Sequence, residues 1–140
     1  MKNEFGRSEC PARRWMVVDD NEEVLRAMAL ALETISDIEI VCFDSGAKAL
    51  EAFSTSPSTF DLVVTDFDMP DMNGIELCRR LRSMSPKLKV VLATGSGLFT
   101  EAEALYNGFR TVLPKPFSIT SLERALRTAG VLDFTEACAI

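Results

Sequence analysis

The chain has 140 residues, of which 47% are hydrophobic and 26% charged, and its formal net charge is −6. This length and composition predict one soluble globular domain rather than a disordered or fibrous chain, and the acidic balance disfavours direct binding of nucleic acid. No apolar run approaches the roughly 18 residues of a membrane span or resembles a secretion signal, so we expect a cytoplasmic protein without membrane attachment.

The first predicted strand follows a polar segment, residues 1–13, which we expect to be flexible. The apolar run 15–18 predicts a buried strand that stops at Asp19 and Asp20. A helix should begin at Asn21, because apolar residues then recur at helical spacing: Val24, Leu25, Met28, Leu32 and Ile35.

Two more strands follow in the chain. Apolar residues between 38 and 43 predict the second strand, and the short amphipathic stretch 47–53 predicts a helix after it. The third strand is the apolar run 62–65, which ends at Asp66. Like the first strand, it delivers a carboxylate at its C-terminal end.

The region after Asp66 contains a turn at 69–74, a helix and the fourth strand. The helix should run towards Pro86 with four residues on its inner side: Ile75, Leu77, Cys78 and Leu81. The fourth strand is predicted at 88–93, and Thr94 follows it. A hydroxyl therefore stands where the first and third strands place carboxylates.

A short helix and the fifth strand come next. Thr100 and Glu103 have capping-box spacing and predict the start of the helix, which Asn107-Gly108 would close. The fifth strand is predicted at 111–113. Lys115 follows it, so a cation is placed at the end of this strand.

The last helix is predicted from a second capping-box spacing, Thr120 with Glu123, and Gly130 would end it. The domain is therefore expected to span residues 14–130. Residues 131–140 would form a C-terminal tail.

The alternation of strands and helices predicts an α/β fold. Strands that are apolar at consecutive positions are buried on both faces, as in a parallel sheet covered by helices on each side. We therefore predict a doubly wound, flavodoxin-like sheet of five parallel strands in the order 2-1-3-4-5. This order would bring Asp19, Asp20 and Asp66 together at the topological switch point.

Three convergent carboxylates would repel one another unless a cation lies among them. Oxygen ligands alone favour Mg²⁺, with Mn²⁺ as a substitute, and Mg²⁺ commonly combines one or two carboxylates with a phosphate oxygen. Asp66 could then accept a phosphoryl group as a nucleophile. Lys115 would supply a fixed cation, and Thr94 a hydroxyl, to the phosphoryl oxygens.

The cysteines, Cys10, Cys42, Cys78 and Cys138, are widely spaced without a CxxC pair, and the chain has no histidine. This pattern disfavours a soft-metal site and predicts reduced thiols that mostly pack. Because no histidine is present, any phosphohistidine donor must be another protein or domain.

Four sequence blocks resemble the signature motifs of the receiver domains of two-component response regulators: VVDDNEEV, VVTDFDMPDMNG, VVLATG and LPKPF, in the family order. The resemblance extends from residue 15 to about residue 130. It implies that Asp66 is the phosphoacceptor and that Asp20 and Asp66 bind Mg²⁺ directly. It also implies that Asp19 acts mainly through water and that the backbone carbonyl of Asp68 is a further metal ligand.

The same resemblance implies that Thr94 is the switch hydroxyl and Lys115 the phosphate-binding lysine, with a cis bond between Lys115 and Pro116. The phosphoryl donor would be a sensor histidine kinase or a histidine phosphotransfer domain, and an output domain or effector protein would respond. Such domains catalyse their own phosphorylation and slow autodephosphorylation without being conventional multiple-turnover enzymes. A homodimer is compatible with the resemblance.

The chain departs from the family pattern at Val112, where relatives usually carry a tyrosine or phenylalanine that turns inward with the switch threonine. Tyr106 or Phe109 could take over that coupling. Alternatively, phosphorylation could order the loop after Thr94, because Gly95-Ser96-Gly97 delays the next helix.

Three alternatives remain open at this point. Residues 66–68 resemble the DxD nucleophile motif of haloacid-dehalogenase phosphohydrolases, although an acidic pair precedes them and the chain has no room for a cap domain. A pseudo-receiver that keeps the fold without phosphorylation is opposed by the presence of all five site residues. The chain could also be part of a hybrid histidine kinase or a longer regulator, or a single-domain relay.

Overall fold

The part of the chain that the computed structural model describes, residues 13–95 and 97–132, is built on a parallel sheet of five strands. The strands are β1 (Arg14–Val18), β2 (Glu39–Phe43), β3 (Phe60–Asp66), β4 (Lys89–Gly95) and β5 (Thr111–Lys115). Their order is β2-β1-β3-β4-β5, and every neighbouring pair is parallel. The predicted fold class and strand order are therefore confirmed.

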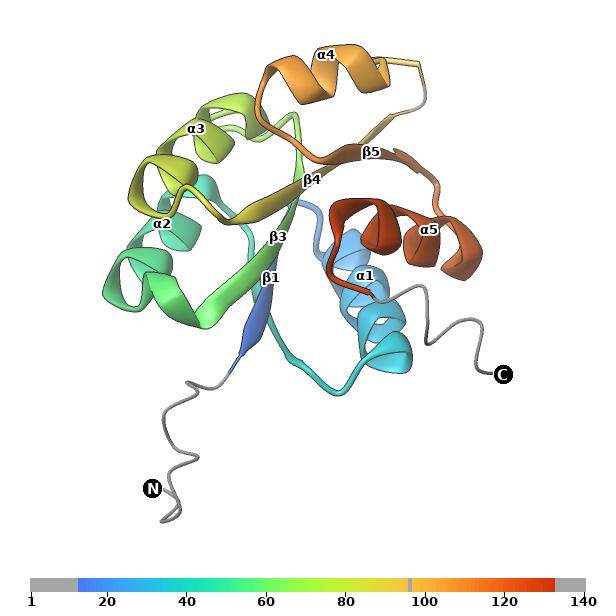
Figure 1. The fold of residues 1–140 in the computed structure, drawn as a ribbon, viewed down its shortest axis with the longest axis horizontal. Helices are drawn as coiled ribbons and strands as arrows, with labels where there is room; N and C mark the ends of the chain where they lie inside the picture. Colours follow the sequence, from blue (N-terminus) through green and yellow to red (C-terminus); the bar gives the residue numbers. More distant parts are fainter. Residues whose placement is uncertain (1–12, 96, 133–140) are drawn as a thin grey trace.

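The connections between the strands are helical: α1 (Glu22–Ile35), α2 (Gly46–Thr55), the short 3-10 helix η2 (Pro57–Thr59), α3 (Gly74–Met84), α4 (Glu101–Tyr106) and, after β5, α5 (Ile119–Ala129). Helices α1 and α5 cover one face of the sheet, and α2, α3 and α4 cover the other (Figure 1). Among the helices of the described residues, none combines the length and apolar character that crossing a membrane requires.

The two faces of the sheet explain why its strands are apolar at consecutive positions. Side chains alternate along a strand, so Trp15 and Val17 of β1 pack on the side of α1 and α5. Met16 and Val18 pack on the side of α2, α3 and α4. All four side chains are buried, which explains why residues 15–18 of β1 are apolar without interruption.

Two of the predicted helix starts are confirmed. Asn21 is the N-cap of α1, and its side chain accepts a hydrogen bond from the Val24 N–H. Thr100 and Glu103 form both bonds of a capping box at the start of α4. Helix α4 has six residues and ends at Asn107, so it is as short as the sequence predicts.

The capping box predicted at Thr120 and Glu123 is wrong. Ser118 is the N-cap of α5: its side chain accepts from the Ser121 N–H, and the Ser121 side chain accepts from the Ser118 N–H. Two serines thus make the reciprocal bonds expected of a threonine and a glutamate, and Thr120 lies within the first turn. The predicted end of the helix is confirmed, since Gly130 adopts the left-handed conformation there.

The predicted terminal segments lie largely outside the described residues, as do Cys10 and Cys138. Val131 and Leu132, assigned to the tail, are partly buried against the core on the side of α1 and α5. The domain boundary near residue 130 stays a prediction.

Candidate functional site

The C-terminal ends of β1 and β3 place three carboxylates close together. Val18 pairs with Thr65 in the parallel register, so Asp19 and Asp66 follow at the same level of the sheet. Asp20 is the next residue of the loop after β1. One carboxylate oxygen from each of the three residues lies within 4.8 Å of the others. The predicted convergence of these residues is therefore confirmed.

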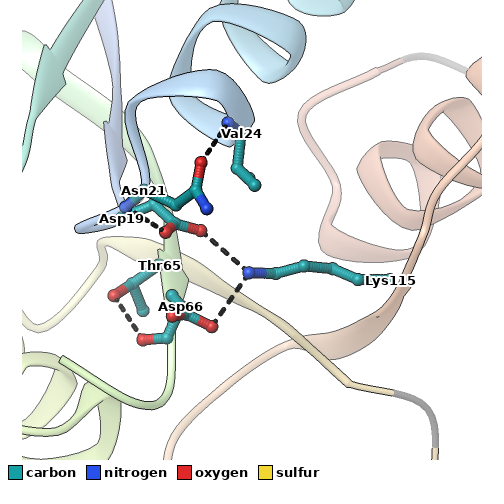
Figure 2. Close-up of polar contacts among 6 residues, drawn as sticks. All are labelled: Asp19, Asn21, Val24, Thr65, Asp66 and Lys115. Atoms are coloured by element: carbon teal, nitrogen blue, oxygen red, sulfur yellow. Dashed lines mark hydrogen bonds and ion pairs between the residues drawn. The ribbon is translucent and has the colours of Figure 1, made fainter.

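Lys115, the last residue of β5, reaches across to this cluster (Figure 2). Its Nζ donates to Asp19 Oδ2 at 2.8 Å and to Asp66 Oδ1 at 3.0 Å. The other oxygen of Asp19 accepts from the Asn21 N–H at 2.9 Å. Both oxygens of Asp19 are thus held, whereas Asp66 is held on one side by the ammonium.

Burial is the largest influence on the pKa of the Asp66 carboxyl. Asp66 is 9% exposed, and this burial raises the pKa of its carboxyl above the usual range. The hydrogen bond from Lys115 acts in the opposite direction, while the nearby charge of Asp19 adds to the rise. The carboxylate therefore keeps more of its basicity than an exposed aspartate beside a lysine would.

Burial alone would lower the pKa of Lys115. The hydrogen bonds and charges of Asp19 and Asp66 outweigh that effect together, and the net result is a raised pKa. The ammonium is consequently a permanent positive charge near neutral pH.

The cluster fits a hard divalent cation. Three carboxylates and one ammonium carry three negative and one positive formal charges, which leaves −2 for an ion to offset. Every side-chain donor is an oxygen, the ligand type that Mg²⁺ prefers. The three carboxylate oxygens, which lie within 4.8 Å of one another, would draw closer together around a bound ion.

The remaining predicted site residues lie on adjacent segments. Asp66 pairs with Ala93 of β4, and the buried Thr94 is the next residue along that strand. Gly95 pairs with Lys115, whose bond to Pro116 is cis as expected. Asp68 is exposed in the loop between β3 and α3. The roles of Thr94 and Asp68 stay predictions.

An aromatic pair beside the site was not predicted from the sequence. Phe67, directly after Asp66, packs against Phe99, with ring centroids 5.0 Å apart and planes tilted by 58°. Phe99 lies in the segment that follows Thr94. The segments that carry Asp66 and Thr94 are therefore in contact through these rings.

The aromatic residues considered in place of Val112 occupy different environments. Phe109 is buried in the core on the side of α3 and α4, whereas Tyr106 is 90% exposed at the end of α4. Val112 itself is half-buried. Neither the coupling of these residues to Thr94 nor the ordering of the loop is tested by this arrangement, and both stay predictions.

The glycine after Asn73 has a steric role at the site. The Gly74 N–H donates to the Phe67 carbonyl at 2.8 Å. A Cβ at Gly74 would lie 2.5 Å from the backbone oxygen of Asp66. Only glycine lets α3 begin so close to Asp66.

A family model described as the response regulator receiver domain matches residues 15–127. The response regulator receiver protein CpdR of Brucella abortus is 34% identical over 113 residues, which cover 79% of this chain and 90% of CpdR. The transcriptional regulatory protein FlgR of Helicobacter pylori is 33% identical over 120 residues, which cover 84% of this chain and 30% of FlgR. The chain thus spans most of one relative and less than a third of the other.

Among solved structures, a response regulator receiver domain protein from Clostridium thermocellum has a TM-score of 0.76 and 26% sequence identity to this chain. The match covers 91% of this chain and 99% of that one. The arrangement of strands and helices is therefore shared over nearly the whole length of both chains.

Proposed function

Because this chain belongs to the response regulator receiver domain family, we propose that Asp66 accepts a phosphoryl group from a phosphohistidine of a partner protein. One observation carries the proposal: the Lys115 ammonium is bonded to Asp66 at 3.0 Å, beside two further carboxylates. A nucleophilic carboxylate, a fixed cation and an oxygen-rich metal site are the parts that phosphoryl transfer to a carboxylate requires.

Asp19, Asp20 and Asp66 would hold Mg²⁺, or Mn²⁺ as a substitute, together with the backbone carbonyl of Asp68. The bound ion would offset the charge on the phosphoryl oxygens during transfer. The donor set and the formal charge of −2 support this assignment. Asp19, whose second oxygen is held by the Asn21 N–H, would act mainly through a bound water.

In the transfer step, an oxygen of Asp66 forms a bond to phosphorus while the bond between phosphorus and the donor imidazole nitrogen breaks. The imidazole leaves with the electron pair. Lys115 moves its bond from Asp66 to a phosphoryl oxygen, and the Thr94 hydroxyl donates to another. Attack of water on phosphorus later restores the Asp66 carboxylate and releases inorganic phosphate, at a slow rate typical of a switch.

The proposed donor is a sensor histidine kinase or a histidine phosphotransfer domain, and the proposed reader is an output domain or an effector protein. We propose that this chain acts in the cytoplasm. The chain itself contains no histidine, so the donor is a separate domain or protein.

Mass spectrometry after treatment with acetyl phosphate and Mg²⁺ tests the proposal. We expect one added phosphoryl group on the wild type and none on Asp66→Asn. Asp37→Asn, which removes an exposed carboxylate elsewhere, is the matched control and should be phosphorylated normally. Omission of Mg²⁺ should abolish the reaction. An unmodified wild type, or a phosphorylated Asp66→Asn, would contradict the proposal.

A further inference from the structure

Asp71 lies in the loop between β3 and α3, and its side chain reaches the N-terminus of α2. Its Oδ2 accepts from the Ala47 N–H at 2.8 Å, and its Oδ1 accepts from the Gly46 N–H at 3.3 Å. The N-cap residue Ser45 accepts from the Lys48 N–H. The first three N–H groups of α2 are therefore all bonded, two of them by a distant segment of the chain.

A second contact fixes the same junction. A Cβ at Gly46 would lie 2.6 Å from Cγ of Met72, so the Met72 side chain packs directly over the buried Gly46. The bond from Ala47 is also the main reason why the pKa of Asp71 lies below its usual range. The ionised carboxylate is thus favoured at the positive end of the helix.

The rest of the loop is tied down as well. Met69 is buried in the core on the side of α2 and α3. The Gly74 N–H closes the loop onto the Phe67 carbonyl at 2.8 Å. Asp68 therefore lies in a short segment that is held by the core, by the start of α3 and, through Asp71, by α2.

We infer that Asp71 is a positioning residue for the metal site, an inference that rests on the proposed function. By holding the loop on α2, it keeps the backbone carbonyl of Asp68 where a divalent ion at Asp19 and Asp66 would meet it. Both carboxylate oxygens of Asp71 are bonded to α2, so Asp71 itself would touch neither the ion nor the phosphoryl group. Its influence passes through the backbone of the loop, as that of outer-shell groups commonly does.

Calorimetric titration of the protein with Mg²⁺ tests this role. Asp71→Ala removes both acceptors and should weaken Mg²⁺ binding about three- to tenfold, less than the roughly tenfold to hundredfold of buried outer-shell partners, because Asp71 is exposed. Asp71→Asn removes the same charge but keeps one acceptor oxygen, so its Mg²⁺ affinity should lie between those of the wild type and Asp71→Ala. Exchange of the Gly46 and Ala47 amides should accelerate in Asp71→Ala without metal.

Gly46→Ala disturbs the contact between α2 and the loop from the α2 side and leaves the net charge unchanged. Its new Cβ would displace Met72, so it should also weaken Mg²⁺ binding. Asp37→Ala removes an exposed carboxylate far from the loop and should bind Mg²⁺ as the wild type does. In phosphorylation assays, the Mg²⁺ concentration for half-maximal rate should rise in Asp71→Ala more than the rate at saturating Mg²⁺ falls.

Equal effects of Asp71→Ala and Asp71→Asn would show that charge rather than anchoring matters, and would overturn the inference. Wild-type affinity in Asp71→Ala would overturn it too. A wild type that binds no Mg²⁺ would instead refute the proposed function, and the positioning role with it.

Discussion

Removal of the Lys115 ammonium should lower the stability of the fold, because the three carboxylates of the site would then repel one another without a nearby positive charge. In Lys115→Met, Asp19 and Asp66 lose bonds of 2.8 and 3.0 Å, and three carboxylates remain within 4.8 Å of one another. Two unit charges at that separation repel by about 3.5 kcal/mol at an effective dielectric constant of about 20. Because Asp20 is exposed and Asp66 can take up a proton, we expect a smaller loss in the free energy of unfolding, about 2 kcal/mol at neutral pH without metal.

Urea unfolding with and without Mg²⁺ measures this loss. Mg²⁺ binds the folded state, and it should stabilise Lys115→Met more than the wild type, because the ammonium no longer opposes the ion. Lys48→Met is the control: its pair with Asp44 at 3.0 Å is exposed, so its loss should stay below about 0.5 kcal/mol. If Lys115→Met were as stable as the wild type in metal-free buffer, or gained no more from Mg²⁺, the electrostatic reasoning would be refuted.

Three further predictions concern the surroundings of the site. Gly74→Ala should lower the free energy of unfolding, measured by urea denaturation, by about 3 kcal/mol and should slow phosphorylation, because its Cβ would lie 2.5 Å from the Asp66 carbonyl oxygen. A variant as stable as the wild type would contradict the packing argument. The pKa of Asp71 is lowered on folding, so its stabilisation is present above about pH 4 and is lost as the pH falls through the folded-state value. The stability difference between wild type and Asp71→Ala should therefore shrink in unfolding curves taken towards about pH 3, and a constant difference would exclude this linkage. In a variant with Cys10 and Cys138 replaced by serine, a thiol reagent should modify the exposed Cys42 in the native state. It should modify Cys78 only on unfolding, because Cys78 is buried and burial raises its pKa to about 11. Rapid modification of both thiols in the native state would count against this prediction.

The architecture and the centre of the site could be predicted because both follow from the ends of the strands. Apolar runs that stop at Asp19, Asp66 and Thr94 define where each strand leaves the core, and the parallel register then places those ends at one edge. The position of Lys115 follows from the same rule. The family match sets aside the haloacid-dehalogenase alternative, which rested on residues 66–68 alone.

The contacts that were not predicted from the sequence all involve side chains that connect separate segments of the chain. The Phe67 and Phe99 pair and the bonds from α2 to Asp71 depend on loop conformation, which apolar periodicity does not encode. The start of α5 was misplaced for a related reason: Ser118 and Thr120 both have suitable side chains for an N-cap, and only the backbone decides between them.

The charges of the site indicate how phosphorylation would be transmitted. Asp19, Asp20, Asp66 and Lys115 sum to −2, which a divalent ion would bring to zero. A phosphoryl group of about −2 in place of the Asp66 charge then leaves about −1 at a largely buried position.

Hydrogen-bond donors would have to approach to offset this excess negative charge, and the Thr94 hydroxyl lies one residue beyond Ala93, the register partner of Asp66. Phe99, in the segment that follows Thr94, packs against Phe67 and so brings this segment into contact with the residue next to Asp66. Because Val112 carries no ring, we predict that this segment, rather than an inward-turning ring on β5, responds to phosphorylation.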